Sequence, residues 1–180
     1  MNVREWALPV YTILIQLATG ALLTLWTVRL SIGSKVEKET RDEIVRIPTL
    51  IIFSTILVAM VGAHFHLSKP YLSFLAVSNL QYSWLSREIL FTVLFFLFTG
   101  CILFLLWFVS GYDRLKDGLG WAAILSGCAT IYCMARIYLL PTQIAWNSLE
   151  TLFFYFVEML LLGVVSLTAM LQMDLNFSIE

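Results

Sequence analysis

The chain has 180 residues, of which 60% are hydrophobic and only 13% are charged, and its mean hydropathy is +0.87. Soluble domains have about 45–50% apolar and about 25% charged residues, so this composition excludes an ordinary soluble protein and indicates a polytopic membrane protein. The composition makes the lipid bilayer an expected partner. The net charge of −1 excludes a global basic field, so we expect no nucleic acid as a partner.

Five apolar stretches are long enough to span a bilayer, which takes about 20 mostly apolar residues per helix. They lack the alternation of a β-barrel, so we expect helices, which satisfy their own backbone groups in lipid. The predicted fold class is all-α, a bundle of five transmembrane helices in a single transmembrane domain over residues 1–180. The helices are expected at about 6–30, 47–66, 84–109, 119–139 and 148–173.

The orientation of the bundle follows from the basic residues of the connections, because connections rich in Lys and Arg stay in the cytoplasm. The first connection carries Lys35, Lys38, Arg41 and Arg46, whereas the fourth, LPTQIAWN, carries no basic residue. We therefore expect the N-terminus outside and the C-terminus inside. Acidic residues alternate with the basic ones in the first connection, which we interpret as a mixed-charge solvated face without assigned chemistry.

Two polar residues lie deep in predicted helices. Gln16 in the first helix and Glu158 in the fifth each lie roughly 15 Å from the outer end, near the midplane of a ~30 Å hydrocarbon core. A carboxylate at that depth is costly and often functional. Two interpretations stay open: a protonated Glu158 that bonds Gln16 or a backbone group and ties two helices together, or a proton path.

Titratable and aromatic groups gather where the second, third and fourth helices meet the outer surface. Both histidines of the chain lie in the stretch HFHLSKP, at the end of the second helix. The start of the third helix, the end of the fourth and the connection after it add further polar groups. The candidates at this surface are His66, Arg87, Glu88, Arg136, Tyr138 and Trp146.

The two histidines do not form an obvious metal or haem site. His64 and His66 are roughly 200° apart around a helix, so they cannot hold one metal from one face. The chain has no other histidine, and its three cysteines match no zinc spacing, so we expect no metal site and no bis-histidine haem. A His–Met pair with Met60 or Met134 stays formally possible.

His66 and Glu88 each allow a structural and a functional interpretation. An imidazole titrates near neutrality, which makes His66 a candidate proton acceptor, although a histidine at a helix end can simply bond a loop carbonyl. Glu88 in the first turn or so of a helix is favoured by the macrodipole, or it faces inward as a site carboxylate. Helical periodicity does not decide between these.

Several motifs of the chain resemble those of a known family. The runs HLSKP, SWLSREIL and ARIYLLPTQIAWNS, with QLATG in the first helix, are similar to the signature of the membrane anchor subunit of the dimethyl sulfoxide reductase family. The resemblance covers the chain from about residue 8 to residue 165. It departs in two respects: Ser68 stands where the family has glycine, and five helices are predicted where the family usually has eight.

The resemblance implies a role in electron transport for anaerobic respiration. Such subunits hold a molybdopterin catalytic subunit and an iron–sulfur (ferredoxin-like) subunit on the bacterial or archaeal cytoplasmic membrane. They oxidise a quinol, typically menaquinol, without haem, so they carry the quinol site of an oxidoreductase and not its catalytic centre. The resemblance matches His66 and Glu88 to quinol oxidation, and we expect Arg87, Arg136, Tyr138 and Trp146 around the quinone.

Two other classes of protein stay open. A cytochrome b-type anchor would show haem absorbance, and the count of two histidines speaks against it. A non-enzymatic membrane scaffold or assembly protein would bind no quinone. The convergence of arginine, glutamate and histidine at one surface argues against the scaffold.

Overall fold

The computed structural model describes residues 3–33, 36–66, 79–139, 142 and 146–177. Within these ranges it is helical and contains no strand, and all of its helices are long and apolar enough to cross a membrane. This confirms the predicted all-α membrane class with five helices. The helices are α1 (Val3–Ile32), α2 (Lys38–His66), α3 (Trp84–Phe108), α4 (Asp113–Tyr138) and α5 (Leu149–Phe177).

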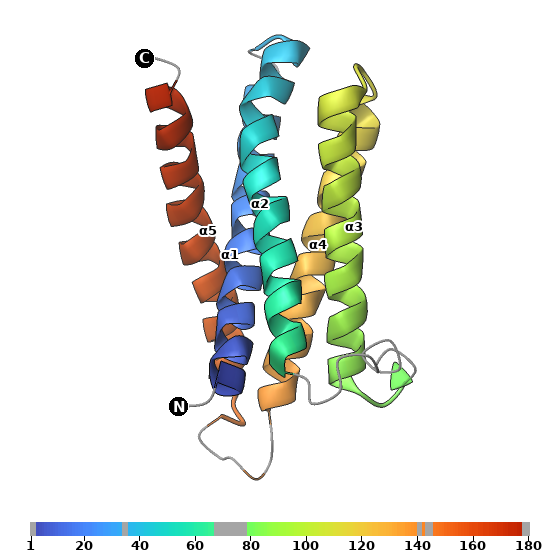
Figure 1. Cartoon of the computed structure of the whole chain (residues 1–180), viewed down its shortest axis with the longest axis vertical. Coiled ribbons are helices and arrows are strands. Elements are labelled where there is room, and N and C mark those ends of the chain that lie inside the picture. Colours follow the sequence, from blue (N-terminus) through green and yellow to red (C-terminus); the bar gives the residue numbers. More distant parts are fainter. Residues whose placement is uncertain (1–2, 34–35, 67–78, 140–141, 143–145, 178–180) are drawn as a thin grey trace.

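The helices alternate in direction, so their ends gather at two opposite ends of the bundle (Figure 1). The end that holds the start of α1 is called here the N-terminal end, and it also holds the end of α2, the start of α3, the end of α4 and the start of α5. The opposite, C-terminal end holds the α1–α2 and α3–α4 connections. α1 contacts α2, α4 and α5, and α3 packs against α2 and α4.

Ion pairs link α1, α2 and α4 at the C-terminal end of the bundle. Arg29 of α1 is fully buried and contacts Asp42 of α2 at 2.7 Å and Asp117 of α4 at 3.0 Å. Lys116 of α4, which is 1% exposed, contacts the other oxygen of Asp42 at 2.6 Å. Buried charges are stable only when they are paired and hydrogen-bonded, so these carboxylates make the burial of both cations possible.

These ion pairs correct the prediction that the first connection is a mixed-charge solvated face. α2 begins at Lys38 and α4 at Asp113, well before the apolar runs that predicted them. Arg41 contacts Asp113 at 3.0 Å, and Asp42 binds two buried cations, so part of the charged segment is packed structure rather than a solvated face. Three acidic residues of this segment are exposed, as expected for a solvated face: Glu37, Glu39 and Glu43.

Glycines allow α1 to approach its neighbours closely. A Cβ at Gly163 of α5 would overlap the backbone of Gly20 of α1, and a Cβ at Gly120 of α4 would overlap the ring of Trp26. Trp26 Nε1 also donates a hydrogen bond to the Asp117 carbonyl at 3.3 Å. Membrane helices are held together by such close packing and by interhelical hydrogen bonds, because lipid supplies no hydrophobic driving force between them.

Candidate functional site

Glu88 lies inside the bundle at the start of α3. The helix is capped by Ser83, whose Oγ accepts a hydrogen bond from Ser86 N at 3.2 Å. Glu88 comes more than one turn later, and its side chain is buried, with only 4% exposure. The structure therefore shows the inward-facing arrangement of Glu88 and assigns the capping role to Ser83.

Two hydroxyl side chains accompany Glu88. Thr92, one turn further along α3, donates to the Glu88 carbonyl at 2.9 Å, and its Oγ1 lies 2.8 Å from the hydroxyl of Tyr11 on α1. The Tyr11 hydroxyl also lies beside the Glu88 carboxyl group. The ion pairs among the described residues do not include Glu88. Glu88 is thus a buried carboxyl group whose described polar neighbours are neutral hydroxyls.

The guanidinium groups of Arg87 and Arg136 lie over the ring of Trp84 rather than beside Glu88. Arg87 Nε donates to the Leu80 carbonyl at 2.8 Å, Nη2 donates to the Gln81 carbonyl at 2.7 Å, and the guanidinium lies 4.3 Å from the centroid of the Trp84 ring. The exposed Arg136 of α4 lies over the same ring at 4.8 Å. Arg87 therefore holds the segment that leads into α3, and both arginines flank an aromatic side chain.

His66 is the last residue of α2 and so lies at the same end of the bundle as Glu88. Its side chain, and residue Ser68, lie outside the described part of the chain. His64 is exposed, and its Nδ1 donates to the Met60 carbonyl at 2.8 Å. Among the described residues, no group of three His, Cys, Asp or Glu side chains is placed to hold a metal ion.

A groove between α1 and α5, called here the α1–α5 groove, opens near the N-terminal end with a volume of about 390 Å³. Small-molecule sites typically have volumes of about 300–1,000 Å³. The Tyr138 ring at the end of α4 lies 6.0 Å from the Trp146 ring and 6.1 Å from the Tyr155 ring of α5. The structure therefore brings the predicted Tyr138 and Trp146 together. The lining residues are Pro9, Thr12, Ile13, Gln16, Tyr138, Trp146, Thr151, Tyr155 and Glu158.

Gln16 and Glu158 meet in the wall of this groove. Gln16 is 1% exposed, and its Nε2 donates to Glu158 Oε2 at 3.1 Å and to the Tyr155 carbonyl at 3.1 Å. The hydrogen bond between α1 and α5 that one of the two interpretations requires is thus present, and it is compatible with the other. Glu158 itself is exposed and borders the groove, so the same carboxylate links two helices and faces the open space.

Comparison with known proteins identifies the family of the chain. The model of the DMSO reductase anchor subunit family (DmsC) matches residues 1–178. The chain belongs to this family. The anaerobic dimethyl sulfoxide reductase chain YnfH of Escherichia coli (strain K12) is 28% identical over 175 residues, which cover 94% of this chain and 58% of that protein. The chain thus spans less than two thirds of this relative's length, and no solved structure matches it.

The family assignment confirms the resemblance predicted from the motifs. The candidate site also contains residues that the sequence did not single out. Tyr11 and Thr92 lie beside Glu88, and Tyr155 joins Tyr138 in the groove wall. Glu88 is not among the described residues that line the α1–α5 groove, although both lie near the N-terminal end of the bundle.

Proposed function

We propose that this anchor-family chain binds the head group of a quinol, menaquinol on the family resemblance, in the α1–α5 groove. The main support is the groove itself, which is lined by three aromatic side chains and lies near the same end of the bundle as the buried Glu88. Flat aromatic faces suit a planar ring, and a few polar groups can fix its orientation. Tyr138, Trp146 and Tyr155 would supply these faces.

Oxidation of a quinol releases two protons with its two electrons, so the site needs proton acceptors within reach of the ring hydroxyls. We assign this role to Glu88 and His66, which share the N-terminal end of the bundle. The Tyr11 hydroxyl lies beside Glu88 and can orient its carboxyl group, and Thr92, which donates to the Glu88 backbone carbonyl, holds the Tyr11 hydroxyl in place. Glu158, about one turn beyond Tyr155 on α5, is a further acceptor at greater depth.

The electrons must leave to an acceptor in another subunit. We propose that an iron–sulfur subunit is this acceptor and that it passes the electrons to a molybdopterin catalytic subunit. We also propose that this chain binds no haem. The proposal of no haem rests on the histidine count, because the two histidines of the chain lie roughly 200° apart around one helix and cannot face each other across a haem. A haem absorbance band assigned to this chain would contradict it.

The distribution of basic residues supports a position in a bacterial or archaeal cytoplasmic membrane with the N-terminal end outside. Connections rich in Lys and Arg remain in the cytoplasm. Three described arginines lie near the N-terminal end: Arg4, Arg87 and Arg136. The described basic residues at the C-terminal end are Arg29, Lys38, Arg41, Arg46, Arg114 and Lys116.

The test uses the whole complex, purified with its partner subunits. Glu88→Gln and His66→Ala should each abolish turnover driven by a quinol and leave turnover driven by a reduced dye intact, because the dye delivers electrons directly to the partner subunits. Glu150→Gln is the matched control, since this exposed carboxylate lies at the same end, in the first turn of α5. Unchanged quinol-driven turnover in both variants would refute the proposal.

A further inference from the structure

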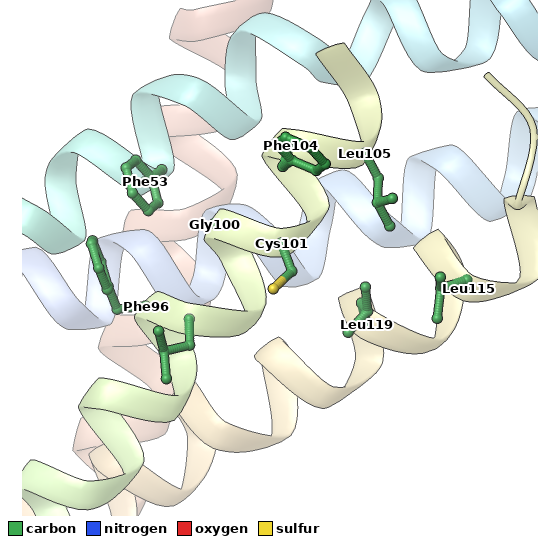
Figure 2. Close-up of a pocket in the computed structure, with 9 residues that line it drawn as sticks. Phe53, Phe96, Gly100, Cys101, Phe104, Leu105, Leu115 and Leu119 are labelled. Carbon is green, nitrogen blue, oxygen red and sulfur yellow. The ribbon is translucent and has the colours of Figure 1, made fainter. Parts of the chain in front are cut away.

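A second hollow surface, called here the α3 groove, lies on the exposed side of α3 and shares no lining residue with the proposed quinol site. It holds two apolar hollows of about 470 Å³ and 390 Å³, which share Gly100 and Phe104. Figure 2 shows the bare Gly100 between Phe96 and Phe104 on α3, with Phe53 of α2 and Leu119 of α4 to either side. Gly100 lines both hollows, and its missing side chain lets the Phe53 ring pack closely against α3.

The α3 groove leads into a polar pocket of about 350 Å³ at the C-terminal end of the bundle. The polar pocket shares Trp107 and Phe108 with the apolar hollow, so the two form one surface. Its charged residues are Lys38, Glu39, Asp42, Arg46 and Asp113.

Arg46 is the cation of this pocket that no described carboxylate neutralises. Asp42 is already bound by Arg29 and Lys116, and Asp113 is bound by Lys38 and Arg41. The guanidinium of Arg46 lies 5.5 Å from the Trp107 ring centroid, and its Nε is buried without a hydrogen-bond partner among the described residues. A buried donor of this kind favours an external acceptor.

The length of the groove matches one leaflet of a membrane. The run from Leu97 to Phe108 rises about 16 Å along α3 at ~1.5 Å per residue, and half of a ~30 Å hydrocarbon core is about 15 Å. Arg46 and Trp107 therefore lie at the depth where lipid head groups begin. Tryptophan is typical of that depth, and arginine there pairs with phosphate through two parallel hydrogen bonds.

We propose that the α3 groove binds one glycerophospholipid, with an acyl chain along Gly100 and Phe104 and the head-group phosphate at Arg46. Basic pockets between transmembrane helices bind lipid head groups in this manner. Lys38, whose side chain is 82% exposed at the mouth of the pocket, is a second donor for the phosphate. The apolar wall alone would bind any hydrocarbon chain, whereas Arg46 favours a lipid whose head group carries a phosphate.

The first test measures the phospholipid that remains bound when the complex is purified in mild detergent and analysed by native mass spectrometry. Arg46→Gln should lower retention of one phospholipid per chain by about tenfold or more, because a hydrogen bond to a charged group is lost. Arg114→Gln is the matched control, since it removes the same charge from an exposed position at the same end. Equal retention in the two variants would overturn the proposal.

The second test uses the unaltered complex, so it does not depend on the folding of a variant. The delipidated complex is titrated with phosphatidylglycerol, with diacylglycerol of the same chains, and with glycerol 3-phosphate. Only phosphatidylglycerol should bind, because the site needs both the chain and the phosphate. Equal binding of diacylglycerol would show an unspecific apolar surface, and equal binding of glycerol 3-phosphate would show a site for free anions; either result would overturn the proposal.

Discussion

Gly20 of α1 and Gly163 of α5 lie in direct backbone contact, about one turn from the hydrogen bond between Gln16 and Glu158. The α1–α5 groove lies immediately beyond this contact, towards the N-terminal end, and is lined by residues that precede both glycines. The close approach therefore fixes the spacing of the two helices at the base of the proposed quinol site.

Substitution at the glycine contact should separate α1 from α5. In Gly163→Ala the new Cβ would meet the backbone of Gly20, and backbone cannot move aside as a flexible side chain can. We expect a loss of about 1–3 kcal/mol, the usual cost of overpacking, together with a higher KM for quinol. The measurements are thermal unfolding of the complex in detergent and quinol-driven kinetics.

Gly62→Ala is the control for this substitution. A Cβ at Gly62 of α2 meets no atom within 4 Å, so the same change in an open helical position should be neutral or should stabilise by up to about 1 kcal/mol. Equal unfolding temperatures for the two alanine variants would show that the glycine contact does not hold the helices together.

Loss of Arg29 should destabilise the C-terminal end of the bundle. Arg29→Gln removes a fully buried cation from Asp42 and Asp117, and breaking a buried ion pair on one side typically costs about 3–5 kcal/mol. Thermal unfolding should show this loss at low and at high salt, because buried pairs are poorly screened. Arg114→Gln at an exposed position should change stability little, and a similar loss there would contradict the role of the buried network.

Variants of Gln16 and Glu158 separate the structural role of their hydrogen bond from a proton path. Glu158→Gln keeps an oxygen that can accept the hydrogen bond from Gln16, so the unfolding temperature should stay unchanged. Quinol-driven turnover should fall, because the groove loses a proton acceptor. Gln16→Leu should cost roughly 1 kcal/mol of stability, the usual worth of an interhelical hydrogen bond. Full quinol-driven turnover in Glu158→Gln would leave the pair with a structural role alone.

Length and hydropathy were sufficient to predict the helices and the depth of their polar residues. Gln16 and Glu158 meet because both helices start at the same end and rise equally per residue, which the sequence alone allowed. The polar beginnings of α2 and α4 were not predictable in the same way. Asp42 binds Lys116, which is 74 residues away along the chain, and a charge run gives no signal of such a partner.

The sequence predicted which candidate residues share one end of the bundle, but not the direction of their side chains. Topology brought Glu88 and Tyr138 to one end, whereas helix rotation decides that Glu88 points inward and that Arg87 reaches back to the carbonyl of Leu80. Tyr155 was missed because an aromatic residue in an apolar run is typical of any membrane helix. Short stretches with weak amphipathicity contain no information on which face meets which neighbour.

The most direct test of the central claim is to map where a quinone binds. A photoreactive quinone analogue is cross-linked to the complex, and the labelled peptides are identified by mass spectrometry. The account predicts labels on the described residues that line the α1–α5 groove, within 9–16, at 138 and within 146–158, and their loss when an excess of menaquinone analogue competes. Labels confined to α2 and α3, or labels that no competitor removes, would contradict it.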